Sequence, residues 1–291
     1  MKHPHEIQSV SPRDFGRAVG VSESTVKRWV DQGRLVSTRT PGGHRRISAV
    51  EALRTIRAMQ LPLRDPVILG VSDLVGDYAK PLAVPGEAFH AIIASGDAKL
   101  AYQVVIGEYM RGSSIWEIAD QVIRPAMHRI GHEGHGPAAV FVEHRATQIV
   151  LEIARSLQVL ATGEHKPVQV VIGGVSGDPY QIPCVLISGV IAEAGAHPVN
   201  LGPDTPASVF LKSLDDIDTP GLIAISVSAV NDVAELSLGL NQVVHAAAER
   251  NCLVAIGGRA VGDLSLDPLP CLRIHTSMAS LAKEVRALTL A

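Results

Sequence analysis

The sequence predicts a multidomain chain with a winged helix-turn-helix α domain, a four-helix bundle and an α/β domain on a doubly wound parallel sheet. Three observations predict this fold class. Residues 28–47 have the pattern of a helix end, a turn and a basic two-stranded wing, and residues 86–163 carry helical periods with short joints. From residue 167 onward, apolar strands alternate with helices. We therefore expect a DNA-binding domain over 1–60, a linker over 61–85, a bundle over 86–163 and an α/β domain over 164–291.

Composition limits the class of protein. The chain has 291 residues, of which 46% are hydrophobic and only 3% aromatic, so the cores are expected to consist of Ala, Val, Leu and Ile. The longest apolar runs fall short of the roughly 20 residues that a membrane span needs, and the polar N-terminus does not resemble a signal peptide. Three widely spaced cysteines fit neither a disulfide framework nor a Cys-x-x-Cys metal site. We expect a cytoplasmic protein with no membrane partner.

Charge is divided unevenly along the chain. The net charge is −3, but residues 1–60 carry 11 Lys and Arg against 5 Asp and Glu, a net charge of +6. The rest of the chain therefore carries −9. A basic head on an acidic body predicts that only the head binds phosphate groups.

Capping residues delimit the elements of the head. A first helix begins at Ser11-Pro12 and ends at Gly20, because Ser caps helices, Pro suits the first turn and Gly suits the end. A second helix follows over 21–30, and a third is expected over 48–59. The first two helices and their short turn predict a helix-turn-helix.

The two remaining parts follow from periodicity. In the bundle we expect four helices, over 86–95, 97–111, 114–132 and 138–162. In the α/β domain we expect strands over 168–174, 197–201, 221–226 and 252–257, and helices over 184–194, 207–213 and 234–250. Ligands of doubly wound sheets bind at the carboxyl ends of the strands, which here lead into loops 173–183, 202–206, 226–232 and 257–262.

Polar and cationic side chains of the second helix and the wing are the candidate DNA-binding residues. They are Ser24, Thr25, Lys27, Arg28, Arg39, His44, Arg45 and Arg46. The helix is expected in the major groove, and the wing cations on the phosphate backbone or in the minor groove. The partner would be a double-stranded DNA operator, bound by a dimer or tetramer because a single small head binds weakly. The alternative is a basic winged domain that contacts another protein.

With these motifs in place, the chain resembles the MerR-type transcription regulators with a cobalamin-binding sensor half, the CarH/LitR family. Three features carry the resemblance: the wing motif Thr40-Pro41-Gly42-Gly43-His44-Arg45-Arg46, the pair Glu143-His144, and the turn Leu201-Gly202-Pro203-Asp204-Thr205-Pro206. The resemblance spans nearly the whole chain. It implies a flavodoxin-like α/β domain of the cobalamin-binding type, and adenosylcobalamin bound between the bundle and that domain.

The resemblance also identifies a candidate ligand pocket. Its family-equivalent positions are Glu143, His144, Asp178, Tyr180, Ser226, Gly257 and Gly258. Family members ligate cobalt through the His of an Asp-x-His-x-x-Gly loop and cover the upper ligand with the Trp of a Trp-x9-Glu-His motif. Here Tyr180 stands at the His position, Pro183 at the Gly position, and the Trp position falls near Gly134. Phenol is a much poorer metal ligand than imidazole, so we predict no cobalamin bound through a histidine.

Several alternatives for the sensor half stay open. It could serve only for oligomerisation, bind cobalamin without a protein ligand and respond to light, or sense another small molecule or haem. His128, His132 and His135 share one helix face and are weak candidates for a metal or haem site, although ordinary polar or interface histidines are the favoured explanation. The sequence contains no hydrolase, P-loop or zincin motif, so we expect no enzymatic activity. The alternative to a regulator is an enzyme of the cobalamin methyltransferase class, in which a helical bundle and an α/β domain also occur together.

Overall fold

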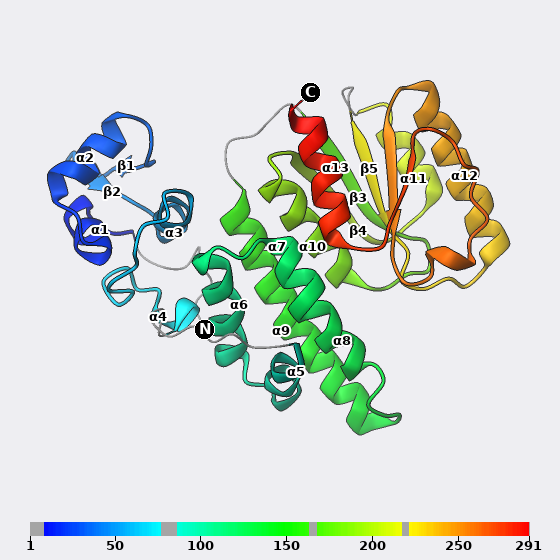
Figure 1. Cartoon of the computed structure of the whole chain (residues 1–291), viewed down its shortest axis with the longest axis horizontal. Helices are drawn as coiled ribbons and strands as arrows, with labels where there is room; N and C mark the ends of the chain where they lie inside the picture. The colour runs from blue at the N-terminus through cyan, green and yellow to red at the C-terminus, as the bar shows by residue number, and fades with distance from the viewer. Residues whose placement is uncertain (1–8, 77–85, 163–167, 217–220, 291) are drawn as a thin grey trace. The chain divides into compact units, whose positions relative to one another are not determined.

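The chain folds as two compact units in the computed structural model, which describes residues 9–76, 86–162, 168–216 and 221–290 (Figure 1). Unit 1 comprises residues 1–114 and 121–160, and unit 2 comprises residues 115–120 and 161–291. The chain therefore passes between the units three times, and each unit is built from segments that are separated in sequence.

Two short helices with side-chain caps open unit 1, as predicted. Helix α1 (Pro12–Val19) is capped by Ser11, whose hydroxyl accepts the Asp14 N–H, and it ends at Gly20 with a φ of 80°. Helix α2 (Glu23–Asp31) is capped by Ser22 in the same way. The left-handed conformation at the end of α1 suits glycine, so the chain can turn directly into α2. Phe15 and Val26 are fully buried in the core of this pair.

A two-stranded antiparallel hairpin follows α2. Strand β1 (Thr38–Arg39) pairs with β2 (Arg45–Arg46), with Arg39 opposite Arg45. The connecting turn is closed by hydrogen bonds between Thr40 and His44, and Gly43 has a φ of 79°. Helix α3 (Ala49–Ala58) then begins at a Ser48 cap.

Helices make up the rest of unit 1. They are α4 (Ser72–Val75), α5 (Gly86–Ser95), α6 (Ala98–Arg111), α8 (Arg124–Ile130) and α9 (Pro137–Ala161). Three of the four predicted helices are found within two residues of their expected ends. Their arrangement as an up-down bundle stays a prediction.

The helix predicted over 114–132 is divided into three parts. It consists of α7 (Ile115–Ile118), a π-helical turn (Ala119–Ile123) and α8. Pro125 lies in the first turn of α8. Because proline cannot donate a backbone hydrogen bond, the regular ladder is interrupted here, and the wider turn accommodates the break. The prediction of one continuous helix was therefore wrong.

Unit 2 contains a five-stranded parallel sheet in the order β4-β3-β5-β6-β7. The strands are β3 (Gln169–Val175), β4 (His197–Thr205), β5 (Leu222–Ser226), β6 (Leu253–Gly257) and β7 (Leu272–His275). This is the flavodoxin-like order, in which the first strand lies inside the second and the winding direction changes between β3 and β5. The predicted doubly wound parallel sheet is confirmed, and the short edge strand β7 was not predicted.

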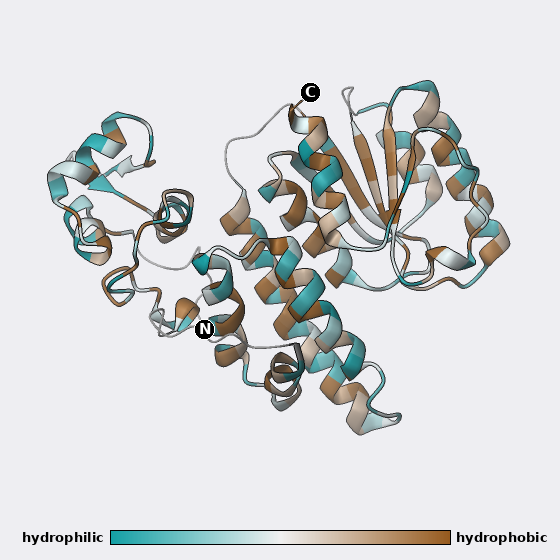
Figure 2. Ribbon diagram, in the orientation of Figure 1, coloured by the Kyte–Doolittle hydropathy of each residue, from teal (hydrophilic) through white to brown (hydrophobic). Residues whose placement is uncertain are grey.

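Helices cover both faces of this sheet. Helices α10 (Gln181–Glu193) and α13 (Met278–Leu290) bury one face, where Ile187, Ile191 and Val285 pack on the strands. Helices α11 (Ala207–Ser213) and α12 (Val233–Glu249) bury the other through Phe210, Leu240 and Val244. The central strands β3 and β5 are accordingly hydrophobic along their length (Figure 2). No helix among the described residues is long and apolar enough to cross a membrane.

Helix α7 belongs to unit 2 although its neighbours in sequence belong to unit 1. Two carboxylates account for this. Glu193 of α10 accepts the backbone N–H of Ile115 at 2.8 Å. Asp120 accepts the N–H groups of Met278 and Ala279, both at 3.1 Å, and so caps the first turn of α13. Each carboxylate satisfies helix N–H groups that have no partner within their own helix.

We predict that Asp120→Ala destabilises unit 2 by about 1 kcal/mol, because the first turn of α13 loses its capping acceptor. Chemical denaturation followed by circular dichroism measures the change. Asp263→Ala, which removes an exposed carboxylate elsewhere in unit 2, is the matched control and should leave the free energy of unfolding unchanged. Equal stability of the two variants would contradict a capping role for Asp120.

Candidate functional site

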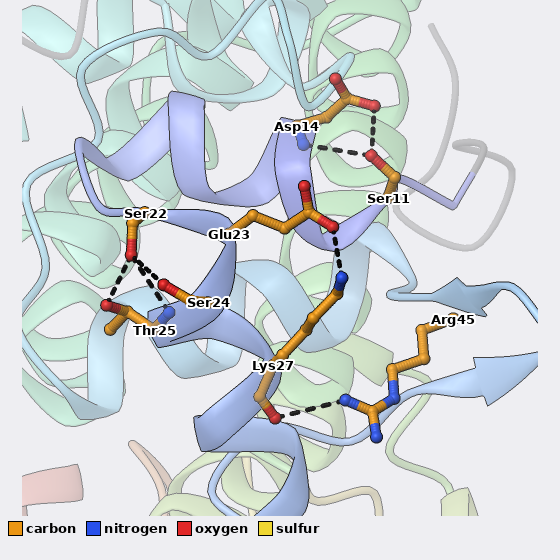
Figure 3. A network of polar contacts seen from close by, with 8 residues as sticks. All are labelled: Ser11, Asp14, Ser22, Glu23, Ser24, Thr25, Lys27 and Arg45. Carbon is orange, nitrogen blue, oxygen red and sulfur yellow. Dashed lines mark hydrogen bonds and ion pairs between the residues drawn. The ribbon is translucent and has the colours of Figure 1, made fainter.

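The first candidate site is the exposed face of α2 together with the hairpin (Figure 3). Ser24, Lys27 and Arg28 are exposed, and Thr25 is half-buried. The hydroxyl of Ser22, the N-cap residue of α2, lies 2.8 Å from that of Ser24 and 2.9 Å from that of Thr25. Both predicted contact residues therefore have their hydroxyl groups within hydrogen-bond distance of the N-cap side chain. Lys27 forms an ion pair of 2.8 Å with Glu23, one turn earlier.

Four of the predicted DNA-binding residues lie on the hairpin, and one of them is less exposed than the other three. Arg39, His44 and Arg46 are exposed, whereas the side chain of Arg45 is only 21% exposed. The guanidinium of Arg45 lies 2.5 Å from an Asp31 carboxylate oxygen and donates to the carbonyl oxygen of Lys27 at 3.3 Å. The sequence analysis grouped all four residues together, because Asp31 lies on another element and its pairing cannot be inferred from spacing.

The second candidate site is the edge of the sheet in unit 2 where the parallel strands end. Asp178 follows β3, and its side chain is completely buried. One carboxylate oxygen accepts the Tyr180 N–H at 3.0 Å, and the other accepts the Ser228 N–H at 2.6 Å. Asp178 therefore connects the loops that follow β3 and β5. These are the two strands between which the winding direction changes, where doubly wound folds bind ligands.

Tyr180 lies at the surface of this edge together with an arginine that sequence reasoning missed. The Tyr180 side chain is 40% exposed, and the Arg259 guanidinium lies 5.0 Å from its ring centroid. Arg259 also donates to the Ser228 carbonyl oxygen at 2.7 Å. Its position directly after Gly257-Gly258 was the available signal, but a glycine pair after a buried strand is common in this fold class.

The two glycines have a packing role of their own. A Cβ on Gly258 would lie 2.1 Å from the Val227 carbonyl oxygen, and one on Gly257 would lie 2.9 Å from the His275 carbonyl oxygen. The backbone of Val227 exchanges hydrogen bonds with Gly257 and Ala260 at 2.8 and 3.1 Å. Close contact between neighbouring loops is thus sufficient reason for glycine at both positions.

The donor set at this edge does not fit cobalamin bound through a histidine. The loop after β3 offers a phenol where an imidazole would be needed, and the acceptor oxygens of Asp178 already hold two backbone N–H groups. Cys184 of α10 is no substitute, because burial, followed by the charge of Asp178, raises the pKa of its thiol to about 12. A protonated, buried thiol is a poor metal ligand.

Ser226, at the end of β5, is buried, and its hydroxyl lies 3.4 Å from that of Ser228. The other predicted residues lie on or next to the helices of unit 1. Glu143 is half-buried and His144 exposed on α9. The rings of His128 and His132 stack with centroids 4.2 Å apart, and His132 Nδ1 lies 2.7 Å from the His128 carbonyl oxygen. His135 is exposed beyond α8. Among the described residues, no three His, Cys, Asp or Glu side chains are grouped to hold a metal ion.

Comparison with known proteins shows a fold shared with a solved structure. No family model matches the chain, and neither does any curated protein. Among solved structures, the monomethylamine corrinoid protein of Methanosarcina barkeri matches with a TM-score of 0.52 and 14% identity, over 68% of this chain and 95% of that one. At this identity the match shows a shared fold alone. The chain therefore shares a fold with that corrinoid protein, and the five-stranded parallel sheet with its covering helices agrees with this.

Two further structures match with lower TM-scores. A cobalamin-binding protein from Desulfitobacterium hafniense has a TM-score of 0.35 at 16% identity, over 70% of this chain and 98% of that one. The methanol:cobalamin methyltransferase complex of Methanosarcina barkeri has a TM-score of 0.37 at 17% identity, over 77% and 84%. TM-scores this low establish neither a shared fold nor a shared function.

We predict that Asp178→Asn destabilises the protein by about 1–3 kcal/mol, because an amide cannot accept both buried N–H groups. Tyr180→Phe removes only the phenol hydroxyl of a partly exposed side chain and should change stability by less than about 0.5 kcal/mol. Chemical denaturation of both variants measures the difference. If Asp178→Asn proves as stable as the parent protein, the carboxylate is not what joins the two loops.

Proposed function

We propose that this chain is a DNA-binding transcription regulator of the MerR type. Its first two helices form a helix-turn-helix, its hairpin is the wing, and its α/β unit is a cobalamin-binding-like module that does not hold cobalamin through a histidine. The observation that carries the proposal is the set of exposed cations on adjacent elements: Arg28 on α2, and Arg39 and Arg46 on the hairpin. Among the described residues these guanidinium groups have no hydrogen-bond partner, which leaves them available for phosphate or base contacts.

The distribution of charge supports this function. The cations lie in the part of the chain with a net charge of +6, whereas the rest carries −9. The acidic remainder repels the DNA backbone, so the electrostatic contribution to binding is confined to the head. We propose that the chain self-associates as a dimer or tetramer, because two heads on a two-part operator bind more tightly than one.

The α/β unit supports a regulatory rather than a catalytic role. Its likeness in fold to a corrinoid protein makes cobalamin a plausible ligand, but Tyr180 removes the expected ligand atom. We propose that the unit acts in oligomerisation or binds another ligand at the edge formed by Asp178, Tyr180 and Arg259.

Arg46→Ala should weaken DNA binding by the full-length protein and lower the slope of log K against log salt by about 0.9, the contribution of one phosphate contact. The probe is a fluorescent duplex selected from a random-sequence pool by the parent protein, and fluorescence anisotropy measures binding. Arg286→Ala, an exposed arginine of α13, is the control and should leave both quantities unchanged. Failure of the parent protein to select any duplex would refute DNA binding.

The purified protein, incubated with adenosylcobalamin in the dark, should lose the cobalamin absorbance on gel filtration, because position 180 offers no imidazole. Its elution volume should be the same before and after green light. Retained absorbance would show that the α/β unit binds cobalamin by other means. Retained absorbance with a light-driven change of size would establish a photoreceptor instead.

A further inference from the structure

Arg45 and Arg46 are neighbours in sequence but have different surroundings. Successive side chains of a β-strand point to opposite faces, so the two guanidinium groups of β2 leave the hairpin in opposite directions. Arg46 is exposed, whereas Arg45 is 21% exposed and directed at α2 (Figure 3). Arg46 therefore lies on the outward face of the hairpin, and Arg45 lies on the face toward α2, which it shares with Arg39 directly opposite.

The donors of Arg45 are occupied by the last turn of α2. One terminal nitrogen donates to the Lys27 carbonyl oxygen at 3.3 Å, and the other lies 2.5 Å from Asp31 Oδ1. The carbonyl end of a helix carries partial negative charge, and Asp31 adds a full one. A planar guanidinium can contact both acceptors at once, which a single lysine ammonium does less well.

Asp31 also offsets a repulsion within the hairpin. Arg45 lies opposite Arg39 across the two strands, and like charges in directly opposite positions destabilise a strand pair. The Asp31 carboxylate beside Arg45 reduces that repulsion. Without Arg45, this 60% exposed carboxylate would be an unpaired anion at the end of α2.

From these contacts we propose that Arg45 is a positioning residue, which holds the hairpin against α2 through Asp31 and the Lys27 carbonyl group instead of contacting DNA. The inference rests on the proposed function and assigns different roles to two adjacent arginines. Arg46 binds the phosphate backbone, and Arg45 determines where the hairpin and α2 lie relative to each other, and therefore whether both can contact one duplex.

The decisive variant is Asp31→Asn, because the two explanations predict opposite signs. If Arg45 contacts phosphate and Asp31 only competes for it, removal of an anion strengthens DNA binding. If Arg45 acts through Asp31, the same change weakens binding, by about tenfold if it removes most of a charged hydrogen bond. Glu23→Gln is the matched control: it neutralises another partly exposed carboxylate of α2, paired with Lys27, and should strengthen binding or leave it unchanged.

Two further variants complete a double-mutant cycle of Asp31 and Arg45, in which affinity for the selected duplex is measured. Arg45→Ala should weaken binding without the loss of salt slope that Arg46→Ala shows, and the double variant D31N/R45A should bind within about twofold of Arg45→Ala alone. Stronger binding by Asp31→Asn, additive effects in the double variant, or equal slope losses for both arginine variants would each overturn the proposal.

Hydrogen exchange of the free protein tests the same contact without DNA. The hairpin amides of Thr40 and His44, which are hydrogen-bonded in the turn, should exchange faster in Arg45→Ala and Asp31→Asn than in Arg46→Ala. Equal exchange in all three variants would overturn the positioning role even if the protein binds DNA. If these amides exchange faster in the two variants but the parent protein selects no duplex, Arg45 still holds the hairpin against α2, and the proposed DNA-binding function is refuted.

Discussion

A parallel sheet must be covered on both faces, and the organisation of unit 2 depends on this constraint. Strands β3 and β5 are buried along nearly their whole length, so four helices are needed to shield them from water. The chain winds from β3 outward to β4 and then back across β3 to β5, β6 and β7, so that α10 and α13 cover one face and α11 and α12 the other. The candidate ligand residues Asp178 and Tyr180 follow β3, next to the point where the winding direction changes.

Polar groups at the candidate sites are largely engaged with the protein itself. Asp178 holds two backbone N–H groups, Arg45 holds Asp31 and a helix carbonyl group, and Arg259 donates to the Ser228 carbonyl oxygen. A buried or half-buried charge needs such partners, because loss of hydration is costly when no hydrogen bond replaces it. Arg28, Arg39 and Arg46 are exposed and, among the described residues, their guanidinium groups have no such partner, so they are the stronger candidates for contact with another molecule.

Charge is distributed unevenly between the head, residues 1–60, and the rest of the chain. The head presents cations to solvent, which suits a polyanionic partner, while the remaining chain is acidic. Unit 2 contains a doubly wound parallel sheet, and the loop after β3 carries Tyr180 where a metal site would need an imidazole. A packed core depends on apolar periodicity spread over many residues, but a metal site depends on single side chains, so the fold alone does not determine which ligand is bound.

The sequence by itself determined the elements that local interactions specify: the helix that begins at its Ser11 cap, and the alternation of strands and helices that predicts the parallel sheet. Each of these signals acts within a few residues, through a helix cap or a repeating apolar pattern. Only the tertiary structure decided which distant groups meet. Strand β7 is a short, partly exposed edge strand, α13 takes its cap from Asp120, 158 residues away, and Arg45 finds Asp31 on another element. Packing brings such partners together, and their distance along the sequence does not predict that they meet.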